Sequence, residues 1–368
     1  MQIADFTLER YFARWEFAVR HVLCASDVEP LGLGELLALA DDDSRTRWES
    51  QRLGYTESLG LPVLREEVAR QYPGLSADDI LMFAGAEEGV FLSMHAMLKP
   101  GDHAVVMWPA YQSLHEVARS IGASVTLVRL DPRDWSFDAD AVAAAMRPNT
   151  RVIVINSPHS PTGAQLDASR FARLLSIAEL HGVHLFSDEV YRLLEHGAPR
   201  LTPAACGSER GVSLGVMSKA YGLAGLRIGW IATRDADLRA RIAALKDYTT
   251  ICNSGPSELL ALMALRASNA VVGRSMSIIE SNLAILDAFF ARNEDRFGWV
   301  RPKAGSVCFP TYRPGSIDAF ASRLVETQGV LILPASQFGY PGDHFRLGYG
   351  RSDMPVALER MEQYARDV

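Results

Sequence analysis

The chain has 368 residues, of which 48% are hydrophobic and 22% are charged, and its formal net charge at pH 7 is −7. This length predicts about two domains, and the negative charge argues against a nucleic acid or an anionic membrane as a partner. The acidic N-terminus lacks the apolar core of a signal peptide, and no uncharged apolar run reaches the roughly 18 residues of a membrane span. The four cysteines are far apart and form no CxxC pair, so we expect a cytoplasmic protein without a metal site.

Residues 5–39 have a mostly helical pattern. In LERYFARWEFAVRHVL, apolar and aromatic residues recur at the spacing of helical turns, which predicts a helix. Pro30 and Gly32 then indicate a loop before a second helix that contains GELLAL. The Gly-x-Gly in this loop is a weak dinucleotide signal, because no predicted strand precedes it.

Short apolar runs in the following part of the chain predict buried strands, because they are bounded by turn residues and are too short for helices. These runs are ILMF, HAVVMW, SVTLVRL, RVIVIN, HLFSD, GVSLGVM and RIGWIAT. Helical patterns lie between most of them, and one of these helices begins near Pro62, which suits a first helical turn. This alternation predicts an α/β fold with one main sheet.

Two of the predicted strands end in polar residues. RVIVIN ends in Asn156 and is followed by the proline-rich stretch SPHSPTG, while HLFSD ends in Asp188. Ligands in open α/β sheets bind at the carboxyl ends of strands, so we expect both side chains in one cleft. A buried carboxylate needs a partner; a metal ion is the alternative partner for Asp188, but no histidine cluster supports it.

The stretch SKAYGLAGLRIGW, residues 218–230, is the most informative part of the chain. It places Lys219 in a glycine-rich loop between two predicted buried strands, with Arg227 eight residues later. A desolvated lysine is a nucleophile that forms Schiff bases, and an arginine can bind a phosphate with two hydrogen bonds. The alternative is a surface lysine in a glycine-rich hairpin.

This stretch resembles the lysine signature of the class I/II aminotransferases, the fold-type-I enzymes that use pyridoxal 5′-phosphate (PLP). The resemblance implies that Lys219 holds PLP as a Schiff base and that Arg227 binds its phosphate. It also implies that Asn156 binds the phenolic oxygen of the cofactor and helps to form the substrate site. Where the family usually has a phosphate-binding serine, this chain has Val216. Either Ser218 takes over that contact or one phosphate bond is lost.

The resemblance assigns further roles around the cofactor. Asp188 is expected to keep the pyridine nitrogen protonated, which makes the ring an electron sink. Tyr191 is expected to give a second bond to the phenolic oxygen, and Tyr111 to stack on the ring. For Tyr111 the alternative is a core tyrosine at a helix start. The turn at Gly85 precedes a predicted helix, and helix N-termini bind anions.

The phosphate is therefore expected at the backbone of Gly85, Ala86 and Glu87. Tyr55 matches the family tyrosine that reaches the phosphate of the neighbouring subunit, which implies a homodimer; the alternative is a packing tyrosine in a turn. Thr249 or Thr250 is a weaker candidate for an approach to the partner's phosphate.

On the substrate side, Arg346 in FRLGYG matches the arginine that binds the α-carboxylate of the substrate, with a surface ion-pairing arginine as the alternative. Gly32, in the N-terminal arm, is a candidate for the side-chain pocket. The family fold is a three-layer α/β/α large domain, with a mostly parallel seven-stranded sheet, and a small α/β domain. We expect an N-terminal arm at 1–45 that is part of the small domain, the large domain at 46–270 and the small domain at 271–368.

The predicted activity is transfer of the amino group of an α-amino acid to a 2-oxo acid. The first 45 residues fit the general family less well, and YFARWEF with the later SD-x-E resembles a subgroup that includes capreomycidine synthase-like enzymes. A PLP-dependent lyase or cyclase is therefore the alternative reaction, because this fold hosts both. A binding protein that kept the fold is a third hypothesis, but the lysine, aspartate, asparagine and both arginines are all retained.

Overall fold

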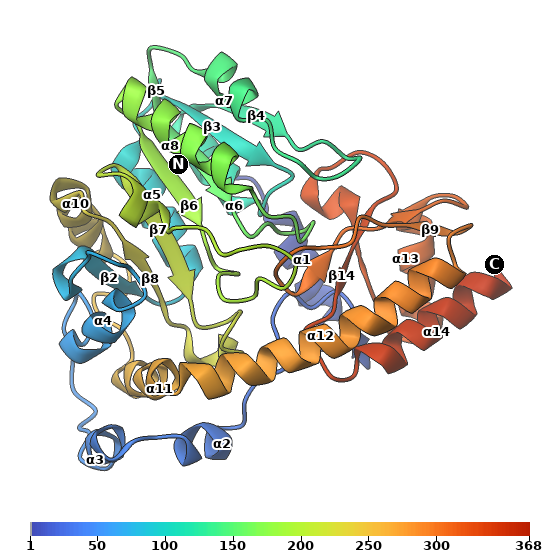
Figure 1. The fold of residues 1–368 in the computed structure, drawn as a ribbon, viewed down its shortest axis with the longest axis horizontal. Coiled ribbons are helices and arrows are strands. Elements are labelled where there is room, and N and C mark those ends of the chain that lie inside the picture. Colours follow the sequence, from blue (N-terminus) through green and yellow to red (C-terminus); the bar gives the residue numbers. More distant parts are fainter. Residues whose placement is uncertain (1) are drawn as a thin grey trace.

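The structure is a computed structural model that describes residues 2–368. Its centre is a sheet with the strand order β2–β8–β7–β6–β5–β3–β4 (Figure 1). The strands are Ile80–Phe83 (β2), His103–Trp108 (β3), Ser124–Arg129 (β4), Thr150–Asn156 (β5), His184–Asp188 (β6), Gly211–Val216 (β7) and Gly229–Ala232 (β8). Strand β8 is antiparallel to β7 and β2, while the pairs that join β3 to β7 are parallel. The predicted mostly parallel seven-stranded sheet is confirmed.

Apolar side chains on both faces of the sheet explain its continuous hydrophobic runs. In β5, Val152 and Val154 enter one hydrophobic cluster, while Ile153 and Ile155 enter another on the opposite face. The first cluster lies under α5 (Ala86–Met97), α6 (Ser113–Ile121) and α10 (Ala236–Lys246), and the second under α7 (Ala139–Ala145) and α8 (Ala168–His181). These layers are the predicted α/β/α sandwich, and the short α9 (Ala204–Gly207) packs beside α8.

Beyond the β2 edge, α4 (Pro62–Ala69) packs on α11 (Gly255–Arg266). Pro62 is the first residue of α4, as expected from its missing N–H. Helix α12 (Ser268–Arg292) follows α11 and runs as one long helix toward the C-terminal part of the chain (Figure 1).

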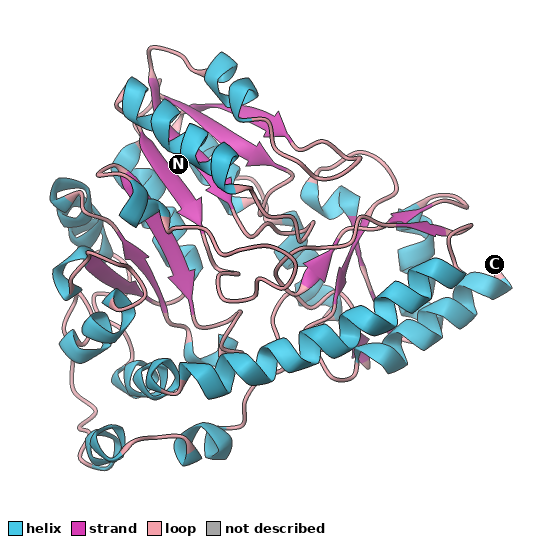
Figure 2. Ribbon diagram, viewed as in Figure 1, coloured by secondary structure: helices cyan, strands magenta, loops and turns pink. Residues whose placement is uncertain are grey.

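The C-terminal part is a smaller α/β body with short strands (Figure 2). Its elements are β9 (Phe297–Gly298), β10 (Val307–Cys308), β11 (Thr311–Tyr312), α13 (Ile317–Gln328), β12 (Val330–Leu331), β13 (Leu333–Pro334), β14 (Phe345–Gly348) and α14 (Met354–Asp367). Strand β14 lies between β10 and β13 in a three-stranded sheet. Three 3-10 turns complete the chain: Ala77–Asp79 (η1), Ala224–Leu226 (η2) and Ala335–Phe338 (η3).

The N-terminal segment departs from the predicted continuous helix. Helix α1 (Thr7–Trp15) ends at Trp15, and residues His21–Val22 form strand β1, which pairs in parallel with Val330–Leu331 of β12. The helical spacing of the apolar residues is therefore interrupted by a strand pairing with a segment about 300 residues away. Local periodicity carries no information about such a partner, and tertiary pairing overrides it.

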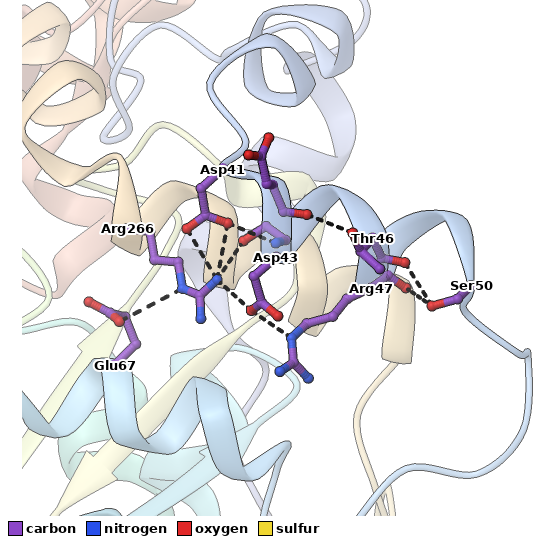
Figure 3. A network of polar contacts seen from close by, with 9 residues as sticks. Asp41, Asp43, Thr46, Arg47, Ser50, Glu67 and Arg266 are labelled. Carbon is purple, nitrogen blue, oxygen red and sulfur yellow. Dashed lines mark hydrogen bonds and ion pairs between the residues drawn. The ribbon is translucent and has the colours of Figure 1, made fainter.

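Two further helices, α2 (Leu33–Ala38) and α3 (Asp42–Glu49), lie apart from the sheet and pack on α11. Arg266, the last residue of α11, anchors them. Its Nη1 donates to the carboxylate of Asp41 at 3.1 Å and to that of Asp43 at 2.9 Å, while Glu67 of α4 lies 4.0 Å from its Nε (Figure 3). Three helices, α3, α4 and α11, therefore meet at this one side chain, and α3 leads directly into the loop that carries Tyr55.

Candidate active site

The carboxyl edge of the central sheet brings together the polar residues predicted from the strand ends. Asn156 is the last residue of β5 and Asp188 is the last residue of β6, and the two are paired in register. Strand β7 ends at Val216, three residues before Lys219. An amide, a carboxylate and an amine thus lie at or just after the ends of three neighbouring parallel strands, at the carboxyl edge of the sheet.

Asp188 is almost fully buried, with 7% of its surface exposed. One of its carboxylate oxygens accepts a hydrogen bond from the N–H of Val190 at 3.1 Å. Burial raises the pKa of Asp188 to about 7, against the smaller lowering effects of the Val190 N–H and the Lys219 charge. A buried carboxylate of this kind favours a cationic ligand group such as a protonated ring nitrogen.

The amine of Lys219 is held at this edge of the sheet by Ser26, a residue that the sequence analysis did not select. Its Nζ donates to Oγ of Ser26 at 2.8 Å and lies 5.5 Å from the centre of the Tyr191 ring. The hydroxyl of Tyr191 donates to the backbone carbonyl of Ser26 at 3.1 Å. The signal was present in SD-x-E, which begins at Ser26, but nothing local connects that motif to a lysine so far along the chain.

Asn156 is engaged with the backbone around it. Its amide group donates to the carbonyls of Pro158 at 3.0 Å and Asp188 at 2.9 Å, and its side-chain oxygen accepts from the N–H of Ser160 at 2.7 Å. These bonds fix the turn after β5 against the end of β6. A bond to the phenolic oxygen of a cofactor would require the amide to exchange one of its present partners, so that role stays a prediction.

The predicted phosphate-binding residues lie together at the N-terminus of α5. Gly85 precedes this helix with φ +92°, a conformation that side chains disfavour, and a Cβ there would lie 2.4 Å from Nη2 of Arg227. A Cβ at Gly229 would lie 2.8 Å from the backbone N of Ala86. The guanidinium of Arg227 therefore lies against the N-terminus of α5, and a cation beside free helix amides suits a phosphate group.

Three further residues bear on the predicted phosphate site: Glu87, Ser218 and Val216. The carboxylate of Glu87 accepts from the hydroxyl of Ser113 at 3.0 Å, and burial raises the pKa of Glu87 to about 7. Ser218 is half-buried next to Lys219, and Val216 is buried at the end of β7 without a hydroxyl to offer.

Tyr111 contacts helix α1. Its hydroxyl donates to the Glu9 carboxylate at 2.5 Å, and its ring centre lies 4.9 Å from that of Phe6. Burial, together with the charges of Glu87 and Glu9, raises the pKa of the Tyr111 hydroxyl. Sequence analysis missed Glu9 because the helical pattern of α1 gives no indication of the element that its polar face meets.

Arg346 in β14 points into the same region and is only 2% exposed. Its Nε donates to the carbonyl of Cys24 at 3.1 Å, and its guanidinium carbon lies 5.6 Å from the ring centre of Phe12. Its Nη2 is buried and has no protein partner among the described residues. An unpaired buried donor is costly, and a carboxylate would satisfy it.

Several predicted residues do not join this cluster within the chain. Tyr55 is 93% exposed, and Gly32 is exposed at the start of α2, with its N–H given to the Glu35 carboxylate. Thr249 and Thr250 are also exposed, and both donate to Oε1 of Glu88 in the same chain. Their expected roles at a subunit interface stay predictions.

The residues present fit PLP. A lysine amine, a buried carboxylate and the Arg227 guanidinium beside the N–H groups of α5 match its aldehyde, its ring nitrogen and its phosphate. A buried arginine with a free donor remains for a substrate carboxylate. Together with the three-layer α/β/α sandwich, this arrangement defines a fold-type-I PLP-dependent enzyme.

Comparison with known proteins supports this class. Residues 34–360 match the family "Aminotransferase class I and II", and the chain belongs to that family. It is 30% identical to capreomycidine synthase from Streptomyces vinaceus, over 94% of this chain and 88% of that protein. It is 28% identical to the arginine–pyruvate transaminase of Pseudomonas aeruginosa, over 85% of this chain and 83% of that protein.

Solved structures of PLP-dependent enzymes are also similar to this chain. A PLP-dependent aminotransferase from Streptococcus suis superimposes with a TM-score of 0.94 at 28% identity, covering 100% of this chain and 99% of that one. The PLP-dependent cyclase OrfR gives a TM-score of 0.91 at 27% identity, covering 100% and 98%. The protein is thus an enzyme of the aminotransferase family with PLP as its cofactor. No helix in residues 2–368 is long and apolar enough to cross a membrane.

Proposed function

We propose that the enzyme transfers the amino group of an α-amino acid to a 2-oxo acid, and that Lys219, Asp188 and Arg346 carry the reaction. The observation that supports this most directly is Arg346. Its guanidinium is buried in the cleft, and its Nη2 lacks a partner in the described chain. A substrate with an α-carboxylate supplies that partner, whereas a simple amine leaves the donor unpaired.

The cofactor, when bound, supplies an aldehyde that accepts the amino group and a ring that withdraws electrons from the substrate Cα. The chain supplies the rest. Arg346 orients the substrate by its carboxylate, and the Nζ of Lys219 removes the Cα proton and returns it during transfer. Asp188, buried and short of cationic partners, stabilises positive charge on the ring nitrogen.

We further propose a basic amino acid as the first substrate class to test. Two carboxylates lie near the proposed substrate residues: Glu9 in α1, which accepts from the hydroxyl of Tyr111, and Glu16, directly after α1, whose pKa the Arg346 charge influences. Burial raises the pKa of Glu16, with a further raising effect from Asp27 and smaller lowering effects from Arg351 and Arg346. One relative is by name an arginine–pyruvate transaminase, so arginine heads the panel.

Cyclisation or elimination on an amino acid is the second candidate. It is supported by the similarity to capreomycidine synthase over 94% of this chain and by the likeness to the cyclase OrfR. Lys219 and Arg346 would then keep their roles, and only the fate of the substrate after loss of the Cα proton would differ.

One experiment separates the candidates. The purified enzyme is mixed with single amino acids, without an oxo acid, and its absorbance is followed while products are analysed by mass spectrometry. Transamination converts the cofactor once, to its amine form, with one equivalent of oxo acid. Cyclisation or elimination gives many turnovers with the cofactor unchanged. A cofactor that remains unaltered by every amino acid, with no product formed, would contradict both proposals.

The identity of the lysine is tested in parallel. The chain has four lysines, Lys99, Lys219, Lys246 and Lys303, so borohydride reduction followed by peptide mapping gives a simple readout. A label on Lys219 is expected, and a label on any other lysine would exclude it as the cofactor lysine.

A further inference from the structure

We propose that Ser26 is a positioning residue for Lys219, and that it keeps the lysine amine aimed at the substrate Cα when the amine is not bonded to the cofactor. This inference rests on the proposed role of Lys219. The two residues are 193 positions apart in sequence, yet Nζ of Lys219 donates to Oγ of Ser26 at 2.8 Å. The structure thus adds to the lysine loop a contact from the N-terminal arm.

The backbone of Ser26 is itself held firmly. Its carbonyl accepts two hydrogen bonds, from the hydroxyl of Tyr191 at 3.1 Å and from that of Ser306 at 2.8 Å. Tyr191 belongs to the segment that follows β6, while Ser306 immediately precedes β10. The serine hydroxyl therefore projects from a backbone position that both parts of the molecule fix, and its position in turn limits where Nζ can lie.

The same short segment also holds the substrate arginine. The carbonyl of Cys24, two residues before Ser26, accepts from Nε of Arg346 at 3.1 Å. The close contact of β14 reinforces this arrangement, since a Cβ at Gly348 would lie 1.9 Å from the carbonyl oxygen of Ala25. One three-residue stretch therefore sets the separation between the proton-transferring amine and the group that binds the carboxylate.

Such a link matters because lysine is a flexible side chain whose amine can take many positions. Proton transfer requires the amine within hydrogen-bond reach of the substrate Cα–H, and small misplacements are costly. The Ser26 hydroxyl restricts Nζ to one region of the cleft. Its loss should therefore slow the steps in which Lys219 moves a proton or captures the cofactor, and leave carboxylate binding by Arg346 unchanged.

The test compares Ser26→Ala with Ser306→Ala. Both remove one hydroxyl from the same cluster, but only the first removes the acceptor of Lys219 Nζ. The first measurement is the rate at which full-length apoenzyme captures PLP covalently, followed by stopped-flow absorbance. We expect about a tenfold slower capture in Ser26→Ala, which corresponds to about 1.4 kcal/mol. In Ser306→Ala we expect a change within about twofold, because Tyr191 still holds the Ser26 carbonyl.

The second measurement uses the holoenzyme with substrate carrying deuterium at Cα. In Ser26→Ala, kcat should fall about tenfold with little change in KM, and the isotope effect on kcat should rise because proton transfer becomes slower. Ser26→Thr, which keeps the hydroxyl, should restore both values. If Ser26→Ala does not fold, Ser26→Cys, with its weak acceptor, takes its place and is expected to show the same losses.

Equal capture rates and equal isotope effects in Ser26→Ala and Ser306→Ala would overturn the proposal, as would a fall in activity that appears only in KM. Failure of the proposed role of Lys219, on which this inference rests, has a different signature. In that case wild-type apoenzyme does not capture PLP on Lys219 at all, whatever residue occupies position 26.

Discussion

Asp188 and Glu87 show how much the site depends on single buried carboxyl groups. The pKa of each carboxyl group is raised to about 7, and burial is the largest cause of both shifts. Neither carboxylate has an arginine as a hydrogen-bonding partner, and for Asp188 the Lys219 charge compensates only in part. A site with poorly solvated negative charge is less stable when empty and gains stability from a cationic ligand group.

The first prediction concerns the pH dependence of apoenzyme stability. The pKa of Asp188 is raised from 3.8 to about 7 on folding, so its ionised form destabilises the folded state, and the loss grows as pH rises from about 4 to about 7. At 1.36 kcal/mol per pH unit the full effect is roughly 4 kcal/mol. Asp188→Asn apoenzyme should therefore be more stable than wild type at pH 8, by up to this amount.

The measurement is urea unfolding of both apoenzymes between pH 5 and 8, where the difference should shrink toward the acidic end. The same substitution should reduce turnover of the holoenzyme by orders of magnitude, because asparagine does not stabilise charge on the ring nitrogen. A stability difference that is constant with pH would mean that Asp188 titrates normally in the folded protein.

The second prediction concerns Arg346. Two charge-assisted hydrogen bonds to a carboxylate are worth roughly 1.5–3 kcal/mol each, so Arg346→Ala should lower kcat/KM by about two to four powers of ten. Arg346→Lys should recover part of this loss, since it keeps the charge without the planar fork.

Steady-state kinetics with the amino acid and with its decarboxylated amine provide the control. The amine should be a poor substrate for wild type and should lose little in Arg346→Ala, and the resting absorbance of the cofactor should stay the same. If wild type uses the amine as well as the amino acid, Arg346 is not a carboxylate-binding residue.

At the scale of elements, buried polar groups of α10 and α11 hold the loop at 51–61 between α3 and α4. Lys246, at the end of α10, is 1% exposed and donates through Nζ to the carbonyl of Ser58. The buried carboxylate of Glu258 in α11 accepts from the N–H of Leu61 at 3.2 Å. Desolvation lowers the pKa of Lys246 and raises that of Glu258. This loop carries Tyr55, so its anchorage bears on the proposed contact with a second subunit.

The third prediction is that Lys246→Met destabilises the protein by about 1–3 kcal/mol, because methionine fills most of the space but leaves the partly buried Ser58 carbonyl without its donor. Chemical denaturation of the holoenzyme measures the change. Lys99→Met is the matched control, since Lys99 is exposed, and it should alter stability by less than about 0.5 kcal/mol. Similar effects from the two substitutions would show that the buried amine contributes no specific bond.

At the scale of the whole molecule, large apolar side chains remain uncovered on two neighbouring segments, the loop before α4 and the turn after α10, which a hydrogen bond from Thr56 to the carbonyl of Asn253 joins. Leu53 is 88% exposed and Tyr55 is 93% exposed, while Tyr248 and Ile251, in the turn after α10, are 91% and 51% exposed. Contiguous exposed apolar surface is typical of an interaction site. We expect a second copy of the chain to cover these side chains and to receive Tyr55 in its own cleft.

The fourth prediction tests that sharing with hybrid dimers of a Tyr55→Phe chain and a Lys219→Ala chain. If Tyr55 serves the partner's site, each hybrid contains one site with both native residues and one without either. Such a hybrid should have about half the activity of a wild-type dimer, above the level of Tyr55→Phe alone. If Tyr55 acts in its own chain, or if the protein is a fully active monomer at assay concentration, mixing restores nothing.

Local pattern was sufficient for much of the fold and for part of the site. Short apolar runs identified the strands of the large sheet, because burial on both faces leaves a continuous hydrophobic signal in each strand. Asn156 and Asp188 could be selected because each ends such a run, and Lys219 because it lies shortly after one, and the carboxyl ends of parallel strands meet at one edge. Gly85 could be selected as a turn before a predicted helix, but the phosphate role of Arg227 came from the resemblance, and only the structure places the two side by side.

The sequence by itself therefore determined which segments of the large domain are strands and which residues lie at the strand ends. Through its motifs, it also determined the family. Only the tertiary structure decided that β1 pairs with β12, so that the helix at the N-terminus ends at Trp15. It alone brought Ser26 to Lys219 and Glu9 to Tyr111. The physical reason is the same in each case: these contacts join segments more than 100 residues apart, and their formation depends on packing that no local periodicity or propensity records.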